Sequence, residues 1–284
     1  MPTTLEVLQK TAQFFTRREI PSPKLEAELL LARALECKRL DLYLRFEQPL
    51  TETQLNTLRE QVTRRGQREP WQYIVGRAGF LDFEVACDKR ALIPRPETEE
   101  LTEVVFARMA TPPATALDLG TGTGVLAIAI ARKWADCQVT AVEASRETLA
   151  LGETNAISTG TSTRINFLSA SWPEVFTTGI GPFDLIVSNP PYLSEEEWAS
   201  AAPEVREWEP RAALVAAENG LADLRAIIQS APAVLTPGGL LALETGIAQH
   251  AMLLTIAATI AAYTRTECLR DLSGHERFFL AWRA

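Results

Sequence analysis

The chain has 284 residues, which predicts one large domain or two unequal ones. Its residues are 46% hydrophobic and 23% charged, an ordinary globular composition that excludes a disordered or fibrous protein. The formal net charge of -8 argues against a protein that binds nucleic acid by neutralising its phosphates. The charge is uneven, because residues 1–90 are slightly basic and residues 91–284 are strongly acidic.

The cysteines and the N-terminus indicate the cellular compartment. The four cysteines are far apart and form no CxxC pair, so the sequence indicates neither a zinc site nor a disulfide framework. The N-terminus has no basic segment followed by an apolar one, and no apolar run is long enough to span a bilayer. We therefore expect a reduced, cytoplasmic protein.

Residues 1–70 are predicted to form a small bundle of helices. Thr51 and Gln54 have the spacing of a capping box at the start of one of these helices. A basic cluster lies near the end of the region and consists of Arg64, Arg65 and Arg68. We interpret this cluster as a solvated helix face, with a surface for docking a partner as the alternative.

The remaining chain is predicted to combine a short linker with an α/β domain. Within residues 71–92 apolar and polar residues alternate, which predicts a hairpin that joins two domains. From residue 115 onward apolar runs alternate with helical stretches, a pattern typical of a parallel sheet covered on both faces. The last two apolar runs are separated only by Ser273-Gly274-His275, which predicts an antiparallel hairpin at the edge of the sheet.

A glycine-rich loop follows the first strand of the predicted sheet. The segment Asp118-Leu119-Gly120-Thr121-Gly122-Thr123-Gly124 leads directly into a helix, and a simple tight turn seldom needs three glycines. The spacing is G-x-G-x-G, so it matches neither the G-x-G-x-x-G dinucleotide fingerprint nor a P-loop. Glu143 ends the next strand, where a carboxylate can accept hydrogen bonds from ribose hydroxyls. The combination predicts a site for a nucleoside without a pyrophosphate.

The tetrapeptide Asn189-Pro190-Pro191-Tyr192 ends a strand that we place next to the first one. Two prolines would also serve simply to stop the strand, but that reading leaves Asn189 and Tyr192 unexplained. A planar amide or amine nitrogen is a poor nucleophile, and hydrogen-bond acceptors must hold its N–H groups before it can be methylated. The Asn189 side-chain oxygen and the Pro190 carbonyl are suitable acceptors, and Tyr192 could stack on the planar group.

These motifs resemble those of known enzymes. The glycine loop with Glu143 resembles the S-adenosylmethionine site of class I methyltransferases, and the tetrapeptide resembles the signature of adenine N6 and glutamine N5 methyltransferases. Further segments along nearly the whole chain resemble the release factor glutamine methyltransferase family. They are Glu26-Ala27-Glu28-Leu29-Leu30, Pro70-Trp71-Gln72-Tyr73, Ile93-Pro94-Arg95-Pro96-Glu97-Thr98-Glu99, Gly238-Gly239 with Glu244 and Gly246, and Asp271-Leu272 with Gly274 and Arg277.

The resemblance implies a fold and a division into domains. The implied fold is the class I methyltransferase α/β fold, with a seven-stranded, mostly parallel sheet that ends in an antiparallel C-terminal hairpin. A helical bundle at residues 1–70 would dock the substrate protein. Residues 71–92 would form the hairpin linker, and residues 93–284 the S-adenosylmethionine-dependent methyltransferase domain.

The resemblance also implies a reaction and its residues. The cofactor would be S-adenosyl-L-methionine, with S-adenosyl-L-homocysteine as product, and the acceptor would be N5 of the glutamine in the GGQ motif of peptide chain release factors. The implied cofactor-binding residues are Gly120, Thr121, Gly122, Thr123, Gly124, Glu143, Trp172 and Asn189. The implied substrate-binding residues are Asn189, Pro190, Pro191 and Tyr192, of which Asn189, Pro190 and Tyr192 are the catalytic ones. We expect a monomer without metal, without direct contact to nucleic acid and without contact to a membrane.

The chain departs from the family pattern at two positions. Glu143 stands where the family usually has Asp, and Ser171 stands where it usually has Asp before Trp172. Three alternatives stay open. They are a related enzyme that methylates a ribosomal protein, an adenine N6 methyltransferase, and a scaffold without catalytic activity. The related enzymes typically carry Pro-Arg-Ser-Pro where this chain has Pro94-Arg95-Pro96-Glu97, which favours the release factor substrate.

Overall fold

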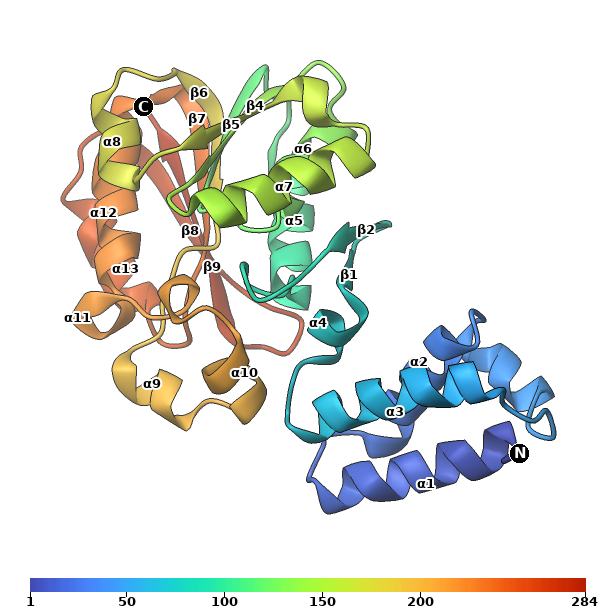
Figure 1. The fold of residues 1–284 in the computed structure, drawn as a ribbon. Coiled ribbons are helices and arrows are strands. Elements are labelled where there is room, and N and C mark those ends of the chain that lie inside the picture. Colours follow the sequence, from blue (N-terminus) through green and yellow to red (C-terminus); the bar gives the residue numbers. More distant parts are fainter. The chain divides into compact units, whose positions relative to one another are not determined.

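The computed structural model describes residues 1–284, and the chain divides into two units (Figure 1). The first unit comprises Met1–Gly76 together with Pro203–Trp208, and the second comprises Arg77–Ala202 together with Glu209–Ala284. No sequence pattern indicated that residues 203–208 would group with the N-terminal helices.

The first unit is helical, as predicted. Its helices are α1 (Thr4–Arg17), α2 (Pro23–Ala34), η1 (Arg39–Leu44), α3 (Glu52–Gly66), α4 (Trp71–Val75) and α10 (Pro203–Trp208). Leucines and aromatic residues from these helices, among them Phe15, Leu30 and Leu58, form one buried core. The predicted capping box is confirmed, because the Thr51 side chain accepts from the Gln54 N–H and the Gln54 side chain accepts from the Thr51 N–H.

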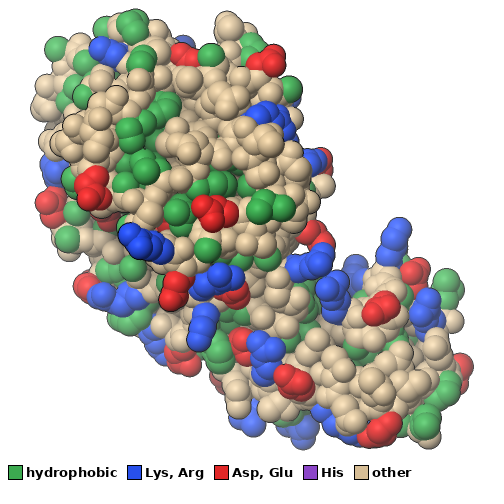
Figure 2. All heavy atoms as spheres, turned by 45° about the horizontal axis from the view of Figure 1, so that its top comes forward, with side chains coloured by type: hydrophobic (Ala, Val, Ile, Leu, Met, Phe, Trp, Pro, Cys, Tyr) green, Lys and Arg blue, Asp and Glu red, His purple; other side chains and the backbone are tan.

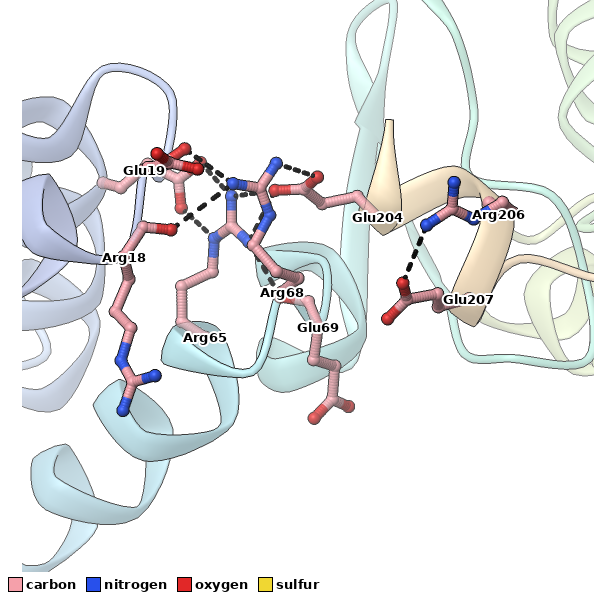
Figure 3. A network of polar contacts seen from close by, with 9 residues as sticks. Arg18, Glu19, Arg65, Arg68, Glu69, Glu204, Arg206 and Glu207 are labelled. Carbon is pink, nitrogen blue, oxygen red and sulfur yellow. Dashed lines mark hydrogen bonds and ion pairs between the residues drawn. The ribbon is translucent and has the colours of Figure 1, made fainter. Parts of the chain in front are cut away.

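The basic cluster at the end of α3 is paired with acidic residues (Figure 3). Arg65 is only 3% exposed, so the interpretation as a solvated helix face is wrong for this residue. Its guanidinium donates to both carboxylate oxygens of Glu26, at 2.5 and 3.0 Å, and to Glu204 Oε1 at 3.0 Å. Arg68 donates to the other Glu204 oxygen at 2.7 Å. The cluster therefore holds α10 against the N-terminal helices.

The second unit contains two sheets. A short antiparallel hairpin of β1 (Arg77–Phe80) and β2 (Phe83–Ala86) lies within the stretch predicted as a hairpin. The main sheet has seven strands in the order β5-β4-β3-β6-β7-β9-β8. These strands are β3 (Thr115–Leu119), β4 (Gln138–Glu143), β5 (Ile165–Ser169), β6 (Phe183–Ser188), β7 (Leu235–Glu244), β8 (Tyr263–Arg270) and β9 (Glu276–Arg283).

Helices cover both faces of the main sheet (Figure 1). The longer helices are α5 (Pro96–Arg108), α6 (Val125–Lys133), α7 (Arg146–Ser158), α12 (Ala222–Ser230) and α13 (His250–Ala258). The shorter ones are η2 (Ser162–Arg164), α8 (Trp172–Thr177), α9 (Glu195–Ser200), η3 (Arg211–Ala213), α11 (Ala217–Gly220) and η4 (Ala231–Ala233). α12 and α13 pack on one face through a buried core that includes Leu241 and Ile227, and α5, α6 and α7 lie on the other.

The predicted fold class is confirmed. Strands β3 to β7 run parallel, whereas β9 is antiparallel to both β7 and β8 at the edge of the sheet. β6 pairs directly with β3, so the segments that follow these two strands emerge side by side at the same edge of the sheet. Sequence motifs that are about 70 residues apart are thereby brought together.

Two further observations concern the surface and the helix lengths. On the face shown in Figure 2, Lys and Arg side chains are interspersed with Asp and Glu side chains in each unit. None of the helices combines the length and the apolar character needed to cross a bilayer.

Candidate active site

A cavity of about 550 Å³ opens at the carboxyl edge of the parallel strands. Its walls come from the segments that follow β3, β4, β5 and β6, as well as from residues 90–95 and from η3. Most of the residues singled out in the sequence line it, namely Gly120, Thr121, Gly122, Thr123, Glu143, Trp172, Asn189 and Pro191. Gly124, Pro190 and Tyr192 are not among the lining residues, and they lie next to residues that are.

The glycine loop turns with a backbone conformation that favours glycine. Gly120, Gly122 and Gly124 have φ angles of 72°, 57° and 85°, a left-handed region that other residues adopt only with strain. Gly124 starts α6, and a Cβ there would meet Gly152 Cα at 3.4 Å. The loop is fixed at its start by the N–H groups of Gly120 and Thr121, which both donate to the Val142 carbonyl at 2.9 Å.

Asp118 lies buried beneath this loop. Its Oδ2 accepts from the Thr121 hydroxyl at 2.6 Å and from the Ala127 N–H at 3.1 Å, so it ties the loop to the first turn of α6. Its Oδ1 is buried and has no hydrogen-bond partner. Burial penalises the carboxylate and raises the pKa of Asp118 to about 7. An unpartnered buried oxygen of this kind suits a nearby cationic group.

Glu143 is half-buried at the end of β4 and lines the cavity. Its Oε2 accepts from the Gly122 N–H at 3.2 Å, and its Oε1 accepts from the Ser145 N–H at 3.0 Å. A carboxylate offers about four acceptor positions, so each oxygen has capacity for a further donor. Glu143 can therefore bind hydroxyl groups in the cavity while it holds Gly122 in place.

Trp172 and Ser171 lie where β5 leads into α8. The Trp172 indole packs beside Gly120, because a Cβ at Gly120 would meet its Cζ2 at 3.5 Å. Ser171 is the N-cap of α8, and its hydroxyl donates to Glu174 at 2.7 Å in a capping box. The Ser171 proton is thus committed to the helix cap, although the residue also lines the cavity.

The Asn-Pro-Pro-Tyr segment leaves β6 toward this cavity. Asn189 Nδ2 donates to the Thr98 hydroxyl at 3.0 Å, which leaves the Oδ1 acceptor at the other side of the amide plane. The Tyr192 hydroxyl donates to Glu244 Oε1 at 2.9 Å. Burial and the neighbouring Glu244 carboxylate raise the pKa of Tyr192 well above its usual value, so the phenol stays a donor.

Two residues of the site were missed by the sequence reasoning. Thr98 and Glu244 belong to segments that we singled out by resemblance, but nothing in the sequence assigned them a role. Both are buried, and the Thr98 hydroxyl donates to Glu244 Oε2 at 2.7 Å. Burial raises the pKa of Glu244 above its usual value.

An ion pair between half-buried Arg95 and buried Glu209 supports another part of the cavity wall. Glu209 accepts from the Arg95 guanidinium at 2.5 Å and from the Ile93 N–H at 3.2 Å. Arg95 and Ile93 both line the cavity. The pair therefore fixes the irregular stretch around Pro94, which contains no regular backbone hydrogen bonds of a helix or strand.

Comparison with known families gives two matches along the chain. Residues 6–76 match the family described as the PrmC N-terminal domain. Residues 97–205 match the family described as the methyltransferase small domain.

Curated relatives match over most of their length. The release factor glutamine methyltransferase of Chlorobaculum tepidum is 42% identical over 253 residues, which cover 85% of each chain. The enzyme of the same name from Rhodopirellula baltica is 35% identical over 290 residues, covering 99% of this chain and 97% of the relative.

Solved structures share the fold at lower identity. The ribosomal protein L11 methylase of Lactobacillus delbrueckii subsp. bulgaricus superimposes with a TM-score of 0.50 at 22% identity, covering 68% of this chain and 81% of that chain. A methyltransferase from Pyrococcus furiosus superimposes with a TM-score of 0.51 at 16% identity, covering 70% and 87%. At these identities the likeness shows the fold alone.

Proposed function

The chain belongs to the release factor glutamine methyltransferase family, and we propose that it methylates N5 of the glutamine in the GGQ motif of peptide chain release factors. Membership of this family makes it a methyltransferase whose methyl donor is S-adenosyl-L-methionine. The proposal concerns its substrate and the residues that act on it.

The residues around the cavity fit this cofactor. A volume of about 550 Å³ lies within the range of small-molecule sites. Glu143 offers carboxylate oxygens to the ribose hydroxyls, and Trp172 offers an aromatic face for the adenine. The unpartnered Oδ1 of Asp118 offers a buried acceptor beneath the loop, and the cationic amino and sulfonium groups would favour the ionised form of this carboxyl over the protonated one. When bound, S-adenosyl-L-methionine supplies an electrophilic methyl group on its sulfonium sulfur.

Asn189 and Pro190 are proposed to hold the glutamine amide. The Asn189 Oδ1 and the Pro190 carbonyl accept the two N–H groups of the amide, and the locked φ of proline keeps the second acceptor rigid. Pro191 lines the cavity beside them, and Tyr192 anchors the segment through its hydroxyl bond to Glu244. Held in this way, the nitrogen presents its lone pair toward the methyl group, so positioning supplies most of the rate enhancement. The methylated nitrogen then releases its surplus proton to water.

The substrate proposal rests on the family and on the segment at residues 93–99. The chain carries Pro94-Arg95-Pro96-Glu97, which favours a release factor over a ribosomal protein. We propose that the N-terminal helices dock the release factor and that the enzyme acts as a monomer in the cytoplasm, where translation takes place. The formal net charge of -8 supports a protein substrate over direct contact with nucleic acid, and charges of both signs are interspersed on the face shown in Figure 2.

One observation carries the proposal. Asn189 and the glycine loop line the same cavity, and they follow two strands, β6 and β3, that pair directly. A methyl donor held by the loop and an amide held by Asn189 would therefore meet.

The direct test is a transfer assay with S-adenosylmethionine labelled in its methyl group. A release factor should be labelled, and the same release factor with the GGQ glutamine changed to alanine should not. Mass spectrometry of the tryptic peptide should place one methyl group on that glutamine. Equal labelling of both release factors would overturn the proposal, and labelling of a ribosomal protein or of DNA in parallel reactions would point to one of the alternatives.

A further inference from the structure

A chain of hydrogen bonds joins the two polar side chains of the Asn-Pro-Pro-Tyr segment to one buried carboxylate. Asn189 Nδ2 donates to Thr98 Oγ1 at 3.0 Å, and Thr98 Oγ1 donates to Glu244 Oε2 at 2.7 Å. On the other side, the Tyr192 hydroxyl donates to Glu244 Oε1 at 2.9 Å. Thr98 comes from the first turn of α5 and Glu244 is the last residue of β7, so two elements far apart in sequence support the segment.

The direction of these bonds follows from the protons available. An ionised carboxylate can only accept, so the single hydroxyl proton of Thr98 must point at Glu244. The Thr98 oxygen is then left with lone pairs alone on its other side, and it can only accept from Asn189. The Asn189 amide must therefore turn its NH₂ group toward Thr98 and its Oδ1 away from it.

We propose that Thr98 and Glu244 are positioning residues that set which way the Asn189 amide faces. Ionised Glu244 orients Thr98, Thr98 orients Asn189, and Oδ1 of Asn189 is thereby presented to the N–H of the glutamine substrate. The inference rests on the proposed function, because it explains how the acceptor for that N–H is held ready. In the opposite orientation, Asn189 would present its NH₂ group to the substrate amide and would repel its N–H.

The surroundings of Glu244 argue that it has a role beyond packing. A buried carboxylate without an ion pair is unfavourable for stability. Arg277, whose charge interacts with Glu244, donates instead to Asp271 at 3.3 Å and to the Thr245 carbonyl at 3.2 Å. Glu244 accepts hydrogen bonds only from the hydroxyl groups of Thr98 and Tyr192. Thr98 in turn accepts from Asn189, so both bonds support the Asn-Pro-Pro-Tyr segment.

Protonation of Glu244 should reverse the orientation. A protonated carboxyl donates to Thr98, and Thr98 then turns its own proton to Asn189 Oδ1. Burial raises the pKa of Glu244, while Arg277 and the two hydroxyl bonds oppose this shift and the carboxylate of Glu97 adds to it. Arg95 also lies close enough for its charge to interact with Glu244. Activity should therefore fall as the pH drops through the pKa of Glu244, and this acid limb should lie above pH 4.5.

The test compares single-turnover rates of variants on a release factor. Thr98→Val keeps the shape but removes the hydroxyl, and a loss of about a hundredfold in kcat is expected with little change in KM. Thr98→Ser restores the hydroxyl and should recover most of the loss. Thr102→Val is the matched control, because Thr102 is equally buried one turn further along α5 and donates to the Thr98 backbone carbonyl.

Glu244→Gln tests the direction of the hydrogen bonds. The new amide oxygen must face the Tyr192 hydroxyl, because this hydroxyl needs an acceptor. The new NH₂ group then donates to Thr98, and the Thr98 hydroxyl donates to Asn189 Oδ1. We expect a kcat at least about tenfold lower and the loss of the acid limb. Glutamine has the same shape as glutamate, so this variant still tests the positioning role of Glu244 if Thr98→Val does not fold.

The outcomes separate the inference from the proposed function. Wild-type enzyme that labels no release factor would overturn both. An active wild type with unchanged kcat in Thr98→Val and Glu244→Gln would overturn the inference alone. Equal losses in Thr98→Val, Thr98→Ser and Thr102→Val would also overturn it, because they would reflect packing of α5.

Discussion

Glu143 gives the sharpest test of the cofactor site. The change is Glu143→Ala, which removes two carboxylate oxygens that line the cavity and that hold the N–H groups of Gly122 and Ser145. A hydrogen bond to a charged group contributes about 1.5–3 kcal/mol. Loss of one such bond to a ribose hydroxyl should therefore raise the Kd for S-adenosylhomocysteine by roughly 10- to 150-fold, and loss of a second bond should raise it further.

Isothermal titration calorimetry measures this change, and two controls give it meaning. Glu147→Ala removes the same charge from an exposed position in the first turn of α7, so it should leave the Kd nearly unchanged. An analogue of S-adenosylhomocysteine without the 2′- and 3′-hydroxyls should bind wild type and Glu143→Ala with similar affinity. If Glu143→Ala weakens the analogue as much as the parent compound, the carboxylate does not bind the ribose and the reasoning fails.

Three further changes test other parts of the structure. Asn189→Ala should lower kcat about 10²- to 10³-fold, as removal of a transition-state hydrogen-bonding group does, and change the free energy of unfolding by less than about 1.5 kcal/mol. Full activity in this variant would exclude the proposed hydrogen bond from the glutamine amide to Asn189. Arg65→Met should cost up to about 3–5 kcal/mol in urea unfolding, because it leaves the half-buried Glu26 without its cation. Arg65→Met combined with Glu26→Gln should regain part of that loss. The pKa of Asp118 is about 7 in the folded protein and about 4 in the unfolded chain. The protonated carboxyl therefore stabilises the fold fully below pH 4, and this contribution is lost as the pH rises to 7. Thermal unfolding without ligand should show that Asp118→Asn lacks this decline, and parallel pH profiles for the two proteins would contradict the assignment.

The sequence predicted those parts of the site that local patterns encode. The positive φ angles of Gly120 and Gly124 are reflected directly in their identity, since other residues adopt this conformation only with strain. The position of Glu143 and Asn189 at one cavity followed from the strand pattern, because Glu143 ends β4, Asn189 follows β6, and the ends of parallel strands share one edge. The alternation of strands and helices predicted the parallel part of the main sheet, and the short connection Ser273-Gly274-His275 predicted its antiparallel edge.

The partners of charged and polar side chains could not be predicted in this way. Thr98 and Glu244 are 146 residues apart, and only the folded sheet brings them together. The run of arginines at the end of α3 resembles an exposed helix face. Arg65 is nevertheless buried, because α10, from a distant part of the sequence, packs on it and pairs it with Glu204. Periodicity reports which face of a helix is apolar, but it carries no information about which acid meets which base.

The buried carboxylates share one structural task. Asp118, Glu209 and Glu244 each accept a hydrogen bond from a segment that borders the cavity, through Thr121, Ile93 and Thr98 respectively. Apolar packing is not directional, so it could bury these loops without fixing the orientation of their polar groups. A carboxylate that only accepts hydrogen bonds dictates where each donor must point, and an amide or hydroxyl in its place would allow two arrangements. Burial of these three acids costs stability, and in return their hydrogen bonds fix the orientation of polar groups in segments that border the cavity.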